Sequence, residues 1–499
     1  MGSKQKVVKG VVWTMIVNLV NAIYGFISVP ILIDYFGKAE YGLIGIAMSI
    51  NVYMNLMDMG FNSTNVRFFS TWLAQNKHER LLKGFQTSLS FYGIIGLLNA
   101  LVLLTIALFS NQIFNITQEQ NEVLRHLFSI LAISAFCQWF SSCFDQVIKA
   151  TENVDWIQKR TLLTKILMLL VLGGTVLFGF SIEIYFILTC LAQLAIVPMS
   201  VGMIKKNLPF VSFAPQWDSQ SFREMLPYCL NIFSFSIFQF SFYNLRPVFL
   251  GIQGTVESVA DYRILNAIIG AVSMFGGTFM NVLLPSAAKI VAQKNNEAYY
   301  RIAYNGTRYV TIVICFCCFG IMVVGPELLT LYVGKEYLYL IPWLNAWLLC
   351  TLGTHNQAIS SLILSGSNIR AITYNSVVAS CVGLILCWFL IPYFQIGGTV
   401  ISFLVYLVIQ LAFYYLYYWP RKMNINSCRV FFTSFLPYVL CGYFLYILST
   451  FFPCMSSLYM DVMVKGGFFL VMYAISIWFL IDKTDKAFVL HLLRRKNER

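Results

Sequence analysis

Apolar residues form long unbroken runs along the whole chain, separated by short polar segments. A membrane-crossing helix needs roughly 20 mostly apolar residues, and runs of that length recur about fourteen times. Unbroken runs are typical of helices, whereas the strands of a membrane barrel alternate apolar and polar positions. We therefore predict an all-α integral membrane protein whose spans occupy residues 8–34, 40–63, 84–110, 123–148, 161–180, 182–204, 224–250, 257–285, 303–325, 339–365, 371–393, 396–419, 431–452 and 463–481.

Two of these spans, 182–204 and 396–419, depend on very short turns. The first follows its predecessor after Gly179-Phe180-Ser181, and the second after Gln395-Ile396-Gly397-Gly398. If the chain did not turn there, the count would fall to twelve.

The amino-acid composition excludes a soluble globular protein. Hydrophobic residues make up 59% of the 499 residues and charged residues only 11%, whereas about 25% of a soluble domain is charged. The segments between the predicted spans are too short for a soluble domain, and they contain no phosphate-binding loop or zinc-protease motif. We expect a transporter rather than an enzyme, with no cofactor and no metal.

The positions of the basic residues predict how the spans are oriented across the membrane. With the N-terminus in the cytoplasm, 28 of the 34 basic residues fall on the inner side, among them Lys165, and six fall on the outer half: Lys38, Arg125, Arg246, Arg263, Lys335 and Lys465. Short loops rich in Lys and Arg face the cytoplasm, so we expect both termini inside. The net charge of +13 then reflects membrane orientation, and no nucleic-acid partner is expected.

Two inner segments indicate an internal repeat. Residues 74–83 and 292–301 share Ala, Gln and Glu at matching positions, and Lys83 matches Arg301. Transporters are often built from such repeats. We predict two six-helix lobes around a central cavity, formed by residues 1–206 and 207–422, and two extra helices with a cytoplasmic tail in residues 423–499. Chance similarity between charged loops is the alternative.

Several short motifs resemble those of the bacterial polysaccharide transporter family. They are Gly37-Lys38-Ala39-Glu40-Tyr41-Gly42, Asp58-Met59-Gly60 followed by Arg67, Leu284-Pro285, and Ser365-Gly366-Ser367-Asn368. This family comprises O-antigen and capsule repeat-unit flippases, in the superfamily that also holds multidrug extruders and lipid II flippases. Many members carry an acidic residue in span seven, where this chain has Tyr243-Asn244-Leu245-Arg246. This departure favours a basic, anion-handling site over acidic ion coupling.

The resemblance implies a function in surface polysaccharide biosynthesis. Members move undecaprenyl-pyrophosphate-linked oligosaccharide repeat units from the inner to the outer leaflet by alternating access. It also implies a multi-pass protein of the bacterial inner membrane. A monomer suffices for a two-lobed cavity, so we expect a monomer, although the sequence leaves the oligomeric state open. The expected partners are the lipid-linked oligosaccharide, membrane lipid, a polysaccharide polymerase and glycosyltransferases.

Polar side chains inside spans are costly and mark candidate sites. Asn18, Asn21 and Tyr24 form a polar stripe at helical spacing, Arg67 and Lys289 lie at matching inner ends of the two lobes, and Arg246, Asp261 and Arg263 lie near the outer ends of spans seven and eight. With Asp58, they are the substrate-cavity candidates. The alternatives are hydrogen bonds between helices for the stripe, orientation signalling for Arg67 and Lys289, and interfacial salt bridges for the outer group.

Two residues could couple transport to protons or ions. Asp58 lies near the inner end of span two, and His355 lies deep in span ten beside Asn356 and Gln357. The alternatives are a local charge pair at a helix end for Asp58 and a packing histidine for His355. The competing functions are a cation-coupled multidrug extruder, an integral-membrane enzyme of envelope assembly, and a non-catalytic scaffold.

Overall fold

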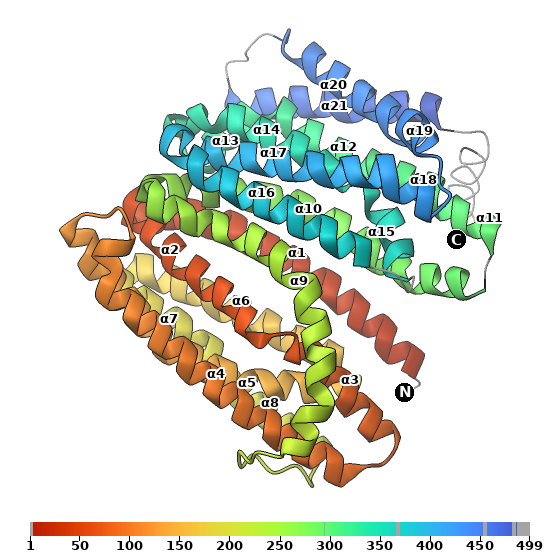
Figure 1. Cartoon of the computed structure of the whole chain (residues 1–499). Coiled ribbons are helices and arrows are strands. Elements are labelled where there is room, and N and C mark those ends of the chain that lie inside the picture. The colour runs from red at the N-terminus through yellow and green to blue at the C-terminus, as the bar shows by residue number, and fades with distance from the viewer. Residues whose placement is uncertain (1–2, 294, 366–369, 453–456, 482–485, 487–499) are drawn as a thin grey trace, which may run out of the picture. The chain divides into compact units, whose positions relative to one another are not determined.

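The computed structural model describes residues 3–293, 295–365, 370–452, 457–481 and 486 (Figure 1). Every regular element among these residues is helical. This confirms the predicted all-α class. Residues Gly366, Ser367 and Asn368 of the fourth motif lie outside the described residues, and so does the side chain of Lys289.

Eleven helical segments of the described chain are long and apolar enough to cross a membrane: 16–36, 78–113, 118–150, 154–178, 182–207, 256–280, 296–323, 371–394, 396–422, 427–449 and 458–480. Each overlaps one predicted span, so the chain is a multi-pass membrane protein. The remaining predicted spans, 40–63, 224–250 and 339–365, are also helical. The first and third contain 3₁₀ turns, and the second contains Pro227 and Pro247. The count of fourteen stays a prediction.

The two short turns separate helices as predicted. Helix α6 (Val154–Phe178) ends at Gly179, whose φ of 69° is left-handed, and the Ser181 side chain then caps α7 (Ile182–Leu194). Helix α16 (Arg370–Phe394) ends before Gln395 at φ 49°, and α17 (Ile396–Phe413) begins at the next residue. The helices after both turns are among the eleven candidate spans.

The second predicted span is broken at its Asp-Met-Gly motif. Helix α2 (Lys38–Met54) passes into a single 3₁₀ turn, η1 (Asn55–Asp58), and α3 (Phe61–Ala74) starts after the break. Met59 and Gly60 both have left-handed backbone conformations, with φ of 49° and 83°. Glycine adopts this conformation without steric cost, which explains Gly60 at the break.

The chain forms two compact units. Unit 1 comprises residues 1–264 and 380–399. In it α1 packs on α6, α4 on α5, and α2 on α5 and α9. Besides α2, α3, α6 and α7, its described helices are α1 (Ser3–Phe36), α4 (His78–Ile113), α5 (Gln118–Ala150), α8 (Val197–Asn207), α9 (Ser219–Gln253), the beginning of α10 (Val256–Ala292), most of α16 and the first turn of α17.

Unit 2 comprises residues 265–379 and 400–499. Helix α12 is its centre, because α14, α20 and α21 all pack on it. Its described elements are the rest of α10, α11 (Asn296–Arg301), η2 (Ile302–Gly306), α12 (Thr307–Val323), α13 (Gly325–Tyr332), η3 (Lys335–Leu340), α14 (Ile341–Thr351), η4 (Leu352–Asn356), α15 (Gln357–Leu364), the beginning of α16, most of α17, η5 (Tyr414–Tyr418), α18 (Trp419–Lys422), α19 (Ser427–Arg429), η6 (Val430–Phe435), α20 (Leu436–Ser449) and α21 (Leu458–Leu480).

Side-chain hydrogen bonds cap the N-termini of several helices. Thr117 forms a reciprocal capping box with Gln120 at the start of α5, and the Asp218 carboxylate caps α9. Hydrogen bonds from the Ser221 hydroxyl and backbone N–H to the carboxylate lower the pKa of Asp218.

Large apolar side chains such as Leu177 and Tyr393 lie on the outside of unit 1, 81% and 82% exposed, as expected for helices that face lipid.

Candidate functional site

Unit 1 holds a group of basic and aromatic side chains that we call the basic–aromatic cluster: Tyr24, Lys38, Tyr41, Lys165, Tyr185, Arg246, Asp261, Tyr262 and Arg263. Tyr24 is the member of the cluster that α1 contributes. The Lys165 ammonium of α6 lies 4.8 Å from the centre of the Tyr24 ring. The Tyr24 hydroxyl forms a hydrogen bond with Tyr185 of α7.

Arg263 of α10 connects to Tyr41 of α2. Its Nε donates to the Tyr41 hydroxyl at 3.1 Å, and its guanidinium lies 4.7 Å from the centre of the same ring. Gly42 and Gly45 permit this contact. A Cβ at Gly42 would lie 2.2 Å from the Val256 carbonyl oxygen, and a Cβ at Gly45 would lie 2.7 Å from the Arg263 side chain. The Tyr-Gly motif thus lets α2 and α10 approach closely.

The carboxylate of Asp261 is held by the start of α2. The Lys38 ammonium pairs with it at 2.7 Å, and the aspartate side chain is only 8% exposed. Since removing either partner would leave a charge with little solvent around it, this pair fixes the α2 and α10 ends together.

Arg246 of α9 is buried at 3% exposure. Three aromatic rings surround its guanidinium, with ring centres 5.2 Å away for Phe242, 5.6 Å for Tyr243 and 5.7 Å for Tyr262. A guanidinium over aromatic faces is stabilised electrostatically, more so where water is excluded.

The cluster is positively charged overall. It contains four cations, Lys38, Lys165, Arg246 and Arg263, against the one carboxylate of Asp261. Two further carboxylates come from the same helices, Glu40 on α2 and Glu183 on α7, and the Glu183 carboxylate is 3.6 Å from the His126 ring nitrogen. An arrangement of guanidinium and ammonium groups with aromatic faces suits a ligand that carries phosphate and sugar.

Asp58 belongs to a different polar network. Its carboxylate accepts hydrogen bonds from the Tyr92 hydroxyl at 2.6 Å and the Asn62 backbone N–H at 3.0 Å. Gln146 donates to the Tyr92 hydroxyl oxygen at 2.7 Å and accepts from Asn65 at 2.6 Å. Each side chain hydrogen-bonds to the next one, so the network links α3, α4 and α5 beside the break between α2 and α3.

Arg67 lies elsewhere in unit 1, in the middle of α3. Its guanidinium is 4.2 Å from the centre of the Tyr228 ring of α9, and the side chain is exposed. The Asn18 and Asn21 side chains of the α1 stripe are both partly buried. The Asn21 side-chain oxygen is buried and has no hydrogen-bond partner among the described residues.

His355 lies in unit 2, in η4, and is buried at 1% exposure. Its Nδ1 is 3.0 Å from the Leu352 carbonyl oxygen, and its Nε2 is 2.7 Å from the Tyr415 hydroxyl. A carbonyl only accepts, so Nδ1 carries the hydrogen, and in the neutral ring Nε2 accepts from the tyrosine. This arrangement favours the packing alternative for His355.

Tyr24, Arg246, Asp261 and Arg263 are predicted site residues, and each lies beside another member of the cluster: Lys165, Tyr262, Lys38 and Tyr41, respectively. The sequence prediction did not include the other five members, Lys38, Tyr41, Lys165, Tyr185 and Tyr262. The sequence offered only a weak signal for them, since Lys165 was counted as an orientation charge and tyrosines are common at membrane interfaces. Lys289, expected at the inner end of α10, has a side chain outside the described residues.

The polysaccharide biosynthesis protein family matches residues 31–342, which is more than half of the chain. The chain belongs to this family. The match spans α2 with its Tyr-Gly motif, the basic–aromatic cluster apart from Tyr24, and the Asp58 network. It confirms the family resemblance drawn from the motifs.

The fold of this family member is that of known transporters. The structure titled lipid II flippase MurJ, inward closed conformation, superposes with a TM-score of 0.68 at 13% identity, covering 94% of this chain and 99% of that one. An inward-facing multidrug resistance MATE family transporter of the MOP superfamily gives 0.61 at 13% identity, covering 79% and 93%. A third structure, of the MATE multidrug transporter DinF-BH, gives 0.60 at 16% identity, covering 85% and 96%. No curated protein matches the chain.

Proposed function

We propose that the protein is a flippase for lipid-linked oligosaccharides. It moves undecaprenyl-pyrophosphate-linked repeat units from the inner to the outer leaflet of the bacterial inner membrane, for O-antigen or capsule synthesis. Family membership supports a place in polysaccharide biosynthesis, and the fold supports transport rather than catalysis.

The observation that carries the proposal is the excess of cations in the basic–aromatic cluster. A pyrophosphate cannot enter hydrocarbon without compensating charges, because each unsatisfied polar group there costs several kcal/mol. Arg263, Lys165 and Arg246 supply those charges in unit 1, and the Tyr24 and Tyr41 rings supply faces on which sugars stack.

The alternative functions receive less support. A multidrug extruder shares the fold, so the fold does not separate it from a flippase. A site with an excess of cations, however, repels cationic drugs and attracts anionic head groups. An integral-membrane enzyme would need an acid–base pair at the site, and Asp261 is already paired with Lys38.

The proposal includes the rest of the predicted architecture. Two lobes, residues 1–206 and 207–422, alternate access to a cavity, and residues 423–499 add two helices and a tail. Both termini are cytoplasmic and the monomer is the transporting unit. A polymerase and glycosyltransferases act before and after it. Arg67 and Lys289 receive the pyrophosphate at the inner side.

Deletion of the gene tests the proposal. Cells without the protein should accumulate the lipid-linked repeat unit in the inner leaflet and lose surface polysaccharide, and the plasmid-borne gene should reverse both effects. Extracted lipids are analysed by mass spectrometry and leaflet location by impermeant labelling. Normal surface polysaccharide in a deletion strain with no second transporter gene would refute the proposal.

A further inference from the structure

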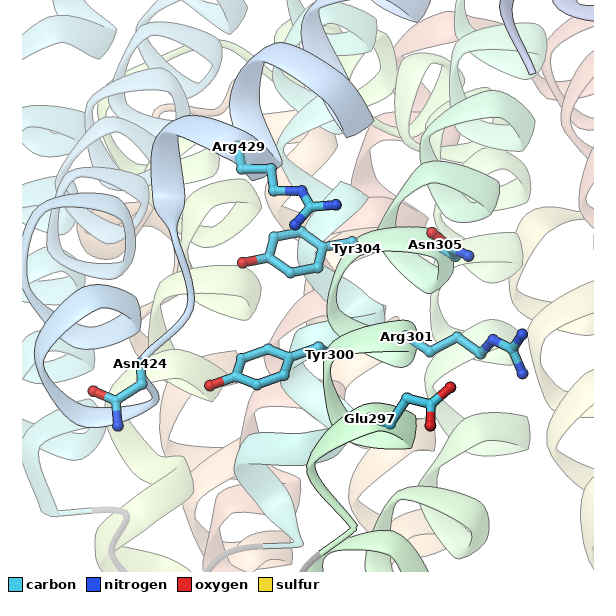
Figure 2. A pocket seen from close by; sticks show the side chains of 7 residues that line it. All are labelled: Glu297, Tyr300, Arg301, Tyr304, Asn305, Asn424 and Arg429. Carbon is cyan, nitrogen blue, oxygen red and sulfur yellow. The ribbon is translucent and has the colours of Figure 1, made fainter. Parts of the chain in front are cut away.

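A polar pocket of about 450 Å³ lies in unit 2 and shares no residue with the basic–aromatic cluster. Figure 2 shows its lining residues: Glu297, Tyr300, Arg301, Tyr304, Asn305, Asn424 and Arg429. Three candidate spans meet beside it, since the spans 296–323 and 427–449 begin there and the span 396–422 ends there. The pocket therefore lies at the depth of lipid head groups rather than in the hydrocarbon core.

The wall formed by Tyr304 is fixed from two directions. The Asn426 backbone N–H donates to the Tyr304 hydroxyl oxygen at 3.1 Å, and the Ser434 hydroxyl donates to the Tyr304 carbonyl oxygen at 3.0 Å. Tyr304 belongs to the π-helical segment η2, a rare geometry that often marks functional sites. Tyr300 and Tyr304 pack on a buried core that includes Trp419 and Ile425. The wall is thus preorganised.

Two arginines face the pocket from different elements. The Arg429 guanidinium lies over the Tyr304 ring, 4.6 Å from its centre, and Arg301 extends on the opposite side of the pocket from the tyrosine rings (Figure 2). Stacking on a ring leaves the in-plane N–H groups of a guanidinium able to bind an anion. Among the described residues no carboxylate lies within salt-bridge distance of either arginine.

We propose that this pocket binds the head group of an anionic glycerophospholipid. The phosphodiester lies between the guanidiniums of Arg301 and Arg429, and the amides of Asn305 and Asn424 with the Glu297 carboxylate bind hydroxyl groups of the head group. Basic pockets between membrane helices are suited to such head groups. None of the lining residues belongs to the basic–aromatic cluster, and the inference does not rest on the proposed transport function.

Lipid titration of the purified full-length protein tests the inference. Protein in detergent is titrated with phosphatidylglycerol or phosphatidylcholine of the same acyl chains, and bound lipid is counted by native mass spectrometry. The wild type should bind phosphatidylglycerol at least about tenfold more tightly, since charge-assisted hydrogen bonds from two guanidiniums are lost with the zwitterionic lipid. The double variant Arg301→Gln/Arg429→Gln should bind both lipids equally.

A matched control uses two basic residues of the same membrane boundary that do not line the pocket. Arg421→Gln/Lys422→Gln removes the same charge from α18 and should keep the preference within about twofold of wild type. An equal loss in this control would mean general surface attraction, and an unchanged preference in the Arg301/Arg429 variant would mean a different site. Either result overturns the inference.

Two further measurements keep the test interpretable. Each single variant, Arg301→Gln and Arg429→Gln, is melted in lipid-free detergent, and at least one with wild-type stability must still show a reduced preference of several-fold. Inorganic phosphate at millimolar concentration is added in a separate arm. Binding of phosphate at this pocket without any preference for the anionic lipid would assign the pocket to a free anion and refute the lipid proposal.

Discussion

Unit 1 contains two polar clusters of opposite character. In the basic–aromatic cluster the cations outnumber the carboxylate, and Tyr24, Lys165 and Arg263 are partly exposed. In the Asp58 network, each donor has an acceptor, and Tyr92, Gln146 and Asn65 are buried. A cluster with excess charge and accessible groups can bind a ligand, whereas a saturated network holds helices in place.

A polar residue in a span therefore has to be judged by its partners. Asp58 and Arg246 looked equally promising in the sequence, because both are charged residues in apolar surroundings. Their neighbours separate them, since Asp58 meets hydroxyl and amide donors whereas Arg246 meets three aromatic rings. Four sets of substitutions test this distinction.

The largest effect is expected for Gly42→Ala. The added Cβ would lie 2.2 Å from the Val256 carbonyl oxygen, so α2 and α10 must separate and the Arg263–Tyr41 contact must break. We expect a loss of stability of about 3 kcal/mol or more and no transport. Thermal unfolding in detergent measures the first, and surface polysaccharide the second. Gly202→Ala is the control, because a Cβ there meets nothing within 4 Å; equal stability of both variants would contradict the predicted close approach.

The next effect concerns charge alone. Arg246→Met keeps the volume beside Phe242, Tyr243 and Tyr262 but removes the charge. We expect transport to fall by about tenfold or more at unchanged protein level, since a charge-assisted contact to the pyrophosphate is worth roughly 1.5–3 kcal/mol. Arg67→Ala should reduce surface polysaccharide less, because that side chain is exposed. Arg125→Ala, an exposed cation on α5 outside the cluster, is the control. Full export in both Arg246→Met and Arg67→Ala would remove these residues from the site.

The Asp58 network gives a smaller and different effect. Asp58→Ala leaves the buried Tyr92 hydroxyl without its acceptor and should cost about 1–3 kcal/mol of stability. Asp58→Asn keeps an acceptor oxygen for Tyr92, so stability and transport should stay close to wild type. If transport needs a proton on Asp58, the Asn variant will be stable yet inactive. Measuring both variants by unfolding and by export therefore separates the structural role from the coupling role.

Much of the fold could be predicted from the hydrophobic pattern, because the apolar run that makes a helix a membrane span is local in the sequence. The short turns at Gly179 and Gln395 were also predictable, since they interrupt apolar runs with residues that accept a left-handed conformation. The break within span two at Met59-Gly60 was not predicted as a break. Its motif was recognised, but a pair of left-handed residues inside an apolar run leaves no mark on hydropathy.

The site was only partly predictable, for a physical reason. Arg246, Asp261 and Arg263 are close in sequence and were grouped together, but Tyr24 meets Lys165 across 141 residues and Arg263 meets Tyr41 across 222. Such pairings depend on which helices pack together, and one sequence without a structure does not state that. The pocket beside η2 was missed for the same reason, since Arg301 and Arg429 come from separate spans.

The smallest effect is expected in unit 2, where His355 resembles the Asp58 network rather than the basic–aromatic cluster. Tyr415→Phe removes the hydroxyl that His355 Nε2 accepts from at 2.7 Å, and a buried unsatisfied nitrogen should cost about 1–2 kcal/mol in thermal unfolding. Transport and its pH dependence should not change, because a histidine whose two nitrogens are both satisfied by fixed partners serves packing. Tyr417→Phe, on an exposed neighbouring ring, should leave both stability and transport unchanged. A shifted pH profile in Tyr415→Phe alone would instead assign His355 to proton coupling, and would move it from the structural class of polar residue to the functional one.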